Sequence, residues 1–175
     1  MMKIHELLLL SPALHVEASR PEMDPLTENG ALQEAQLLDI RFDALTRTVG
    51  LLFELRAALQ LRDTNTGVLV ANGVSELSWS GRSSTGLTAW TVGRSRPHLD
   101  RRLFRLDLDM WPAPGAELKL EAESAAFFAV DVPGLPEAPP DYSEPDRMKI
   151  KAEIAAWESS FQPVHAVFYD ATTQL

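Results

Sequence analysis

Cysteine is absent from this chain of 175 residues. Disulfide frameworks, zinc sites built on thiolates and cysteine nucleophiles are therefore excluded, and the absence suits the reducing cytoplasm, where we expect the protein to act. Long hydrophobic runs are lacking too, since no stretch approaches the roughly 20 apolar residues of a membrane helix. The leucine run at 7–10 ends at Ser11 and Pro12 and is too short for a signal peptide. We therefore expect a soluble protein that has no membrane partner.

Motifs of the common catalytic and cofactor sites are also missing. The sequence contains no GxGxxG, no GxxxxGK[ST], no GxSxG and no HExxH string. Four histidines are present, and no two of them stand at the i, i+4 spacing of a helical metal pair. His165 lies in an apolar segment and is interpreted as a partly buried, hydrogen-bonded imidazole. We predict no catalytic residue, no metal site and no cofactor, and we favour a protein that is not an enzyme.

Positive charge is scarce, because 16 lysines and arginines face 25 aspartates and glutamates, which gives a net charge of −9. Nucleic acids and anionic membranes attract proteins through positive charge, so neither is an expected partner. Two interpretations of the acidic excess stay open. It serves solubility alone, or it provides an acidic face for a basic partner protein.

Alternation of apolar and polar residues dominates the middle of the chain and predicts strands. The clearest case is 101–110, where Phe104, Leu106, Leu108 and Met110 share one face. We expect one domain over 1–175, with an irregular lead-in at 1–36 and a β core at 37–132. Strands within the core are predicted at 37–43, 48–56, 67–80, 86–93, 101–110 and 117–123, and 125–132 either extends the last of these or forms another strand. Antiparallel hairpins are expected to join 37–43 with 48–56 and 101–110 with 117–123.

The C-terminal third begins with a strap at 133–145 that holds five prolines. Ser143 and Asp146 form a capping box ahead of a helix predicted at 146–161, and a final strand follows at 164–170. One helical stripe carries the residues expected to dock on the sheet, namely Ile150, Ile154, Trp157 and Phe161. The fold class is therefore α+β, a mainly antiparallel sheet or sandwich of about six to eight strands with a C-terminal helix packed on it. A flattened barrel remains open, since strand count does not fix closure.

Two tryptophans flank a small polar segment in "ELSWSGRSSTGLTAWTV". If residues 83–86 form a hairpin loop, Trp79 lies opposite Trp90 and Leu77 lies opposite Val92. Both indoles then share a face with large apolar residues, whereas the other face is small and polar. This pattern predicts that both tryptophans are part of the core.

Arginines gather in one segment of an otherwise acidic chain, with five of the twelve at 94–105. Guanidinium groups bind phosphates and carboxylates in a bidentate manner, so the segment is a candidate anion site. The candidate residues are Arg94, Arg96, Arg101 and Arg102. The alternative is a solvated segment that balances acidic stretches elsewhere.

Asp107 and Asp109 project on one face of a predicted strand, and paired carboxylates are capable of acid–base chemistry. Arg105 and Lys119 stand close enough in the pattern to neutralise them across strands, which is the interpretation we favour. An enzyme that uses Asp107, Asp109 or His98 is a third hypothesis.

The order "LLDIRFDALTRTVGLLFEL", then "VLVANGVSELSWS", resembles the small acidic β-rich immunity-type proteins of bacterial toxin systems. The resemblance covers residues 35–80 and implies a non-catalytic protein that binds and blocks a cognate, often basic, partner. We accordingly predict an acidic protein-interaction module, with a small-molecule or anion-binding domain using the 94–105 arginines as the alternative. An exposed strand edge leaves room for a homo-oligomer.

Overall fold

The computed structural model describes residues 1–9, 17–81, 87–100 and 102–171. Within these residues seven strands form one antiparallel sheet, which confirms the predicted fold class. A short 3₁₀ helix, η1 (Ile4–Leu9), precedes the strands, and the helix α1 (Arg147–Ala152) precedes the last of them. The strands are β1 (Gln36–Asp43), β2 (Thr48–Glu54), β3 (Thr66–Gly81), β4 (Trp90–Asp100), β5 (Leu103–Trp111), β6 (Ala116–Asp131) and β7 (Gln162–Asp170).

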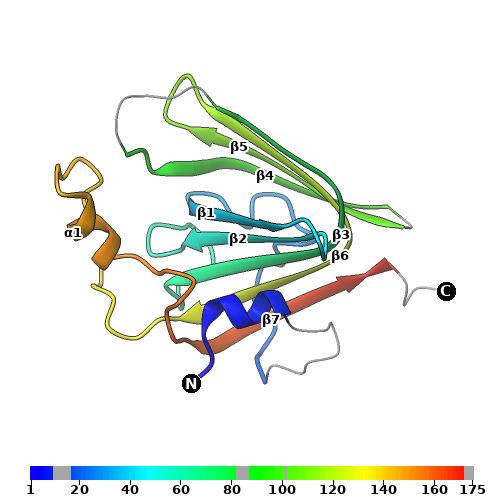
Figure 1. Cartoon of the computed structure of the whole chain (residues 1–175), viewed down its shortest axis with the longest axis horizontal. Coiled ribbons are helices and arrows are strands. Elements are labelled where there is room, and N and C mark those ends of the chain that lie inside the picture. The colour runs from blue at the N-terminus through cyan, green and yellow to red at the C-terminus, as the bar shows by residue number, and fades with distance from the viewer. Residues whose placement is uncertain (10–16, 82–86, 101, 172–175) are drawn as a thin grey trace.

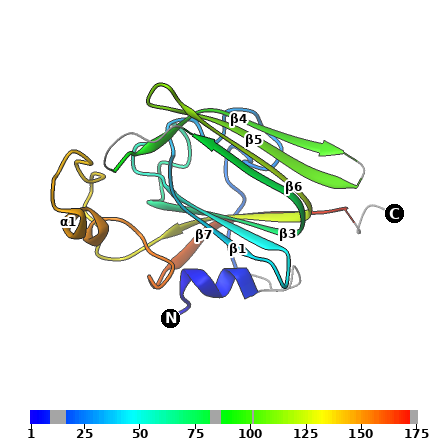
Figure 2. The same ribbon diagram turned by 45° about the horizontal axis from the view of Figure 1, so that its top comes forward.

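The sheet folds into two layers because β3 and β6 are long and run through both (Figures 1 and 2). They pair along their whole length, from Thr66 opposite Val130 to Gly81 opposite Ala116. The first layer holds β1, β2, β7 and the adjoining halves of β3 and β6, and the second holds β4, β5 and the other halves. Gly73, at φ +65°, lies between the two halves of β3 in a conformation that side-chain-bearing residues avoid.

The pairings close into a ring, in the order β3-β2-β1-β4-β5-β6 and back to β3. The contact that completes the ring is small, since β1 and β4 pair only at Gln36 with Thr91 and Leu37 with Trp90. Beyond Leu37, β1 pairs with β2 on one side and with no described strand on the other. The ring is therefore closed at one point and open beyond it.

Alternation explains the strands that the sequence predicted. In β5, Phe104, Leu106 and Leu108 are fully buried while the intervening side chains are not, and the expected hairpin with β6 forms with Leu106 opposite Leu120. The interior between the layers is filled by side chains from all seven strands, from the segment before β1 and from the segment after β2. Its large, fully buried members include Leu32, Phe53, Leu69, Phe104, Leu106 and Phe127.

One predicted boundary is wrong. The strand expected at 86–93 begins at Trp90 and continues to Asp100, so the arginine-rich segment is largely strand and not loop. Its inward positions are Ser95 and Pro97, which are buried but small, and the hydrophobic pattern therefore fades there. Ser95 is 2% exposed, and its side-chain oxygen accepts a hydrogen bond from the Leu32 amide.

The predicted helix is also wrong in length, because α1 ends at Ala152 and not at 161. It lies beyond one end of the layers and not on a sheet face (Figures 1 and 2). Its N-cap is Asp146, which accepts from the amides of Met148 and Lys149, whereas Ser143 donates to Asp141. The backbone after the helix bonds instead to the N-terminal segment, with Ser159 accepting from Ile4 and Trp157 from His5.

The stripe that suggested a longer helix is nevertheless buried. Trp157 and Phe161 join Ile4 and Leu7 in a second, smaller core on the outer face of the first layer. The segment approaches so closely that a Cβ on Gly50 would lie 2.7 Å from Trp157 Cη2. The side chains that the helical spacing predicted to be buried are therefore buried, although the backbone beyond Ala152 is not helical.

A buried ion pair anchors the proline-rich strap. The Arg56 and Glu54 side chains are 5% and 1% exposed, and Arg56 Nη2 lies 2.6 Å from Glu54 Oε2. Arg56 also donates to the carbonyls of Pro136 and Ala138 in the strap and to that of Glu153 after α1. One guanidinium therefore joins β2 to the strap and to the helix end.

Tyr142 closes the other end of the strap by donating to Gln36 Oε1 at 3.0 Å. Burial raises the pKa of Tyr142 from 10.0 to about 12, and the negative charge of Glu54 adds to the shift. The unfolded chain loses this proton near pH 10.0, whereas the folded protein keeps it until about pH 12. Stability is therefore expected to fall with rising pH between these values, its full contribution being present below them.

Tyr142→Phe is expected to make this alkaline decline shallower, as measured by urea unfolding across the same range. Some decline remains, because burial and the charges of Asp100 and Asp170 also raise the pKa of Tyr169. Tyrosinate absorbance of the folded protein provides a direct check. Ionisation of Tyr142 near pH 10 in the folded state contradicts the prediction.

Candidate functional site

Two indole rings meet where the strand ring is open. Trp79 lies near the end of β3 and Trp90 begins β4, and their ring centroids are 5.7 Å apart with an interplanar angle of 76°. Trp90 is partly buried against the core, but Trp79 is 42% exposed. The prediction that both indoles are core is therefore wrong for Trp79.

The expected hairpin does not bring them together. At Trp79 the partner of β3 is Leu118 in β6, and at Trp90 the partner of β4 is Leu37 in β1. The predicted register of Trp79 opposite Trp90 is therefore wrong, although the two side chains do touch. The loop expected at 83–86 lies outside the described residues. Because no strand pairing joins them, the indoles meet across the opening of the sheet.

The tryptophans border an open hollow of about 290 Å³, which we call the tryptophan hollow. Its lining residues are Leu37, Leu38, Asp39, Ile40, Trp79 and Trp90. Leu37 is the last residue of β1 that pairs with β4, and the pairing of β1 with β2 is irregular between Leu37 and Asp39, so these four consecutive residues line the hollow where the edge of β1 becomes open. The tryptophan hollow therefore follows the open edge of β1.

Asp39 is the ionisable lining residue of this hollow among those that the structure describes. Its Oδ2 accepts from Trp157 Nε1 at 2.7 Å, and its Oδ1 accepts from the Ile40 amide at 2.9 Å. Both oxygens are engaged, and no second titratable side chain lines the described hollow to share a proton with it. The arrangement is suited to docking a side chain and not to acid–base chemistry.

The candidate arginines are spread along β4 and the turn after it. Arg94 and Arg96 project from the outer face, opposite Asp109 and Asp107, and both are exposed. Arg96 forms an ion pair with Asp109 at 3.2 Å. Arg102 is exposed in the turn, and Arg101 lies outside the described residues. The anion site stays a prediction, with one of its arginines already paired to a carboxylate.

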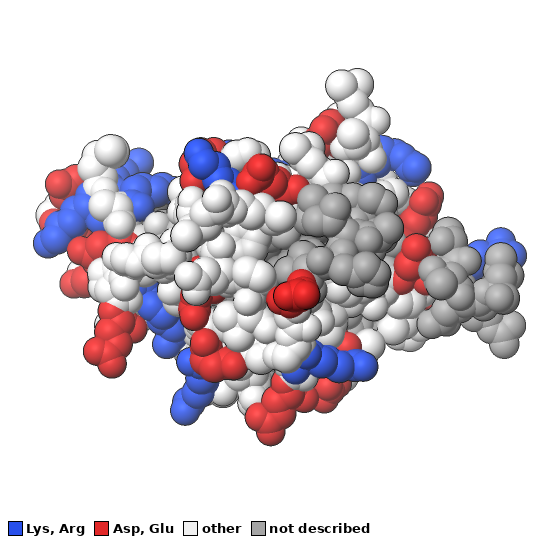
Figure 3. Space-filling view, turned by 90° about the horizontal axis from the view of Figure 1, so that it is seen from below, with Lys and Arg blue, Asp and Glu red and all other residues white. Residues whose placement is uncertain are grey.

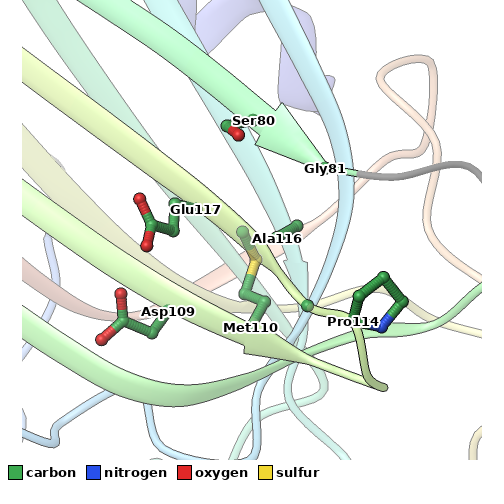
Figure 4. A pocket seen from close by; sticks show the side chains of 8 residues that line it. Ser80, Gly81, Asp109, Met110, Pro114, Ala116 and Glu117 are labelled. Carbon is green, nitrogen blue, oxygen red and sulfur yellow. The ribbon is translucent and has the colours of Figure 1, made fainter.

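Asp109, which lies opposite Arg94 in the register, borders a wider hollow of about 540 Å³ at the turn between β5 and β6. Asp109 and Glu117 are cross-strand neighbours, and Figure 4 shows their carboxylates projecting to the same side. Asp107 faces Lys119 in the register, as the sequence suggested, and Arg105 pairs with Glu121 at 2.7 Å. Charged residues of both signs share this outer face, as on a sheet face open to water, although Asp109 and Glu117 are like-charged neighbours.

Charge is mixed on another side of the molecule as well. Figure 3 shows acidic and basic side chains interspersed among uncharged ones in the view from below. The acidic excess is therefore not gathered into one patch on that face. Any electrostatic attraction that the acidic excess exerts is therefore a property of the whole molecule and not of one patch on this face.

Sequence reasoning missed a hydrogen-bonded chain of Ser19, His165 and Asp63. His165 Nδ1 lies 2.7 Å from Ser19 Oγ, and its Nε2 lies 2.5 Å from Asp63 Oδ2. The three residues come from distant parts of the sequence, so no local motif announces them. A hollow of about 260 Å³ lies beside His165 and Asp63.

These residue types also form the Ser-His-Asp triad of hydrolases, but the arrangement differs from it. In the triad Nε2 serves the serine and a buried aspartate holds Nδ1. Here the nitrogens are exchanged, and the Asp63 side chain is 59% exposed. Backbone bonds place Ser19 beside β7, with its amide donating to Val164 and its carbonyl accepting from Ala166. We interpret these hydrogen-bonded side chains as a structural contact that holds the segment around Ser19 on the edge of β7.

No helix in the described part of the chain is both long and apolar enough to cross a membrane. A scan against protein-family models gives no match, and a search of curated proteins gives none. Among solved structures, the chain is similar to the crystal structure of an uncharacterized protein from Neisseria gonorrhoeae, at 14% identity and a TM-score of 0.44. That likeness covers 57% of this chain and 94% of the other, and at this score it supports no argument about function.

Proposed function

We propose that this protein is a non-enzymatic interaction module that binds an extended segment of a basic partner protein at the tryptophan hollow. The observation that carries the proposal is Trp79, a large aromatic side chain that is 42% exposed beside an open strand edge. Tryptophan is enriched among the residues that dominate binding energy at protein interfaces. An indole pair in a hollow is an anchor point of this kind.

The edge of β1 supports an extended partner. A strand that lacks a neighbour presents main-chain donors and acceptors to an added strand, and pockets alongside it select the partner's side chains. Beyond Leu37 no described strand pairs with this edge of β1, and the hollow follows it, with the Ile40 amide already donating to Asp39 Oδ1. We infer that the partner adds a strand there and places one side chain in the tryptophan hollow, beside the two indoles.

The net charge of −9 favours a basic partner over a second copy of the chain. Opposite charge speeds association and like charge opposes it. A cytoplasmic, immunity-type role, in which the module blocks a basic toxin, is the form of this function that the resemblance over 35–80 implies.

Binding of two short synthetic peptides of equal length tests the proposal, one alternating lysine with threonine and the other alternating glutamate with threonine. Trp79→Ala is expected to weaken binding of the lysine peptide by about tenfold or more, because the anchor is lost. Trp111→Ala is the matched control, since Trp111 is 49% exposed but follows the outward positions of β5. Calorimetric titration measures both variants.

Equal binding of the two peptides, or binding indifferent to Trp79→Ala, overturns the proposal. Self-association of the protein without peptide assigns the open edge to a second copy and also overturns it. Inorganic phosphate in the same titration tests the alternative. Binding that Arg94→Ala abolishes, with no peptide response, favours the anion-binding domain.

A further inference from the structure

We propose that the tryptophan hollow binds a cationic head group, the ammonium of a lysine or the guanidinium of an arginine on the docked segment. The inference rests on the proposed function and names the side chain that the partner inserts. It follows from the angle between the rings, the size of the hollow and the charges beside it.

Ring geometry is the first argument. The faces of aromatic rings carry negative potential, and indole attracts cations more strongly than the other aromatic side chains do. The planes of Trp79 and Trp90 stand at 76° to one another, so they form a corner with walls in two directions. Aromatic cages for ammonium groups gain their affinity by presenting several ring faces to one cation.

Size is the second argument. Clefts that enclose small-molecule ligands measure about 300 to 1,000 Å³. The tryptophan hollow, at about 290 Å³ and wide open, suits a single side chain and not a whole ligand. Leu37 and Ile40 supply an aliphatic lining against which the methylene stem of a lysine or arginine packs.

Charge is the third argument. Asp39 lines the hollow, and its carboxylate accepts hydrogen bonds from Trp157 and Ile40 and forms no ion pair with the residues that the structure describes. Arg41, the next cation along β1, forms its ion pair with Glu158, at 3.0 Å. Arg41 also stacks on Trp157, with 5.1 Å between its guanidinium carbon and the ring centroid. Trp157, on the outer face of the first layer, therefore already stacks against a guanidinium, whereas the indole of Trp79 is exposed.

Choline and dimethylbutanol form a probe pair that isolates the charge, since a carbon atom replaces the ammonium nitrogen in the alcohol. We expect choline to shift the indole Nε1–H signals of Trp79 and Trp90 in NMR spectra and to leave that of Trp111 unchanged. Choline is expected to bind about threefold to tenfold more tightly than the alcohol. Trp79→Leu, which keeps an apolar side chain and removes the ring, is expected to abolish this preference.

Each remaining outcome separates the inference from the proposed function. Equal binding of choline and the alcohol, or no shift at Trp79 and Trp90, overturns the cation site. Binding of the lysine peptide that still depends on Trp79 would then leave the proposed function standing, with an apolar anchor. A preference for choline together with no peptide binding supports the cation site and overturns the interaction module.

Discussion

Arg56→Met is expected to lower the free energy of unfolding by about 3–5 kcal/mol, because it leaves the Glu54 carboxylate buried without its counter-ion. Glu54 is 1% exposed, and its two oxygens accept from Arg56 Nε and Nη2 at 2.8 and 2.6 Å. The substitution also removes the donors that hold the strap and the end of α1. Urea unfolding followed by circular dichroism measures the loss.

The matched control is Lys149→Met, which breaks the exposed pair with Glu144 and should change the free energy of unfolding far less, because solvent screens that pair. The double variant Glu54→Leu with Arg56→Met removes both charges and is expected to recover much of the stability. An Arg56→Met variant as stable as Lys149→Met would show that the pair contributes little. A double variant no better than the single one would place the loss in the strap contacts.

Trp157→Ala is expected to cost about 3–5 kcal/mol, the usual range for removing a buried tryptophan. The side chain is 2% exposed and covers Gly50, and its Nε1 donates to Asp39. Loss of this cover should also loosen the N-terminal segment, whose His5 amide donates to the Trp157 carbonyl. Chemical denaturation gives the energy, and hydrogen exchange at His5 reports the loosening.

Trp157→Phe separates packing from hydrogen bonding, because it keeps an aromatic ring and removes the N–H group. We expect this variant to cost about 1–2 kcal/mol and to retain slow exchange at His5. Equal losses for the alanine and phenylalanine variants would mean that the bond to Asp39, and not packing, dominates. Unchanged exchange in Trp157→Ala would separate the N-terminal segment from this core.

The sequence predicted strands best where apolar residues fill every inward position. β5 alternates without interruption and was recognised, whereas β4 was cut short at its small inward residues, Ser95 and Pro97. A buried serine that accepts a backbone hydrogen bond looks polar in a sequence. The hydrophobic pattern of a sequence shows which side chains are apolar, but it does not show which strand positions are buried.

Helical spacing misled for a related reason. The stripe from Ile150 to Phe161 is buried, so the pattern was right about burial and wrong about backbone. The carbonyls of Trp157 and Ser159 accept from His5 and Ile4 across the chain, and that of Glu153 accepts from Arg56. Hydrophobic periodicity cannot predict hydrogen bonds between residues that lie so far apart in the sequence.

The sequence by itself determined the acidic charge, the absence of thiol chemistry and the inward and outward faces of most strands. It placed both indoles on one inner face, because alternation is a local property of extended backbone. Only the tertiary structure decided which strands pair, where the ring stays open and that Trp79 meets solvent there. It also joined Ser19, His165 and Asp63 and set Arg56 on the strap. Main-chain donors and acceptors are alike in every strand, so only the packing of the whole chain selects their partners.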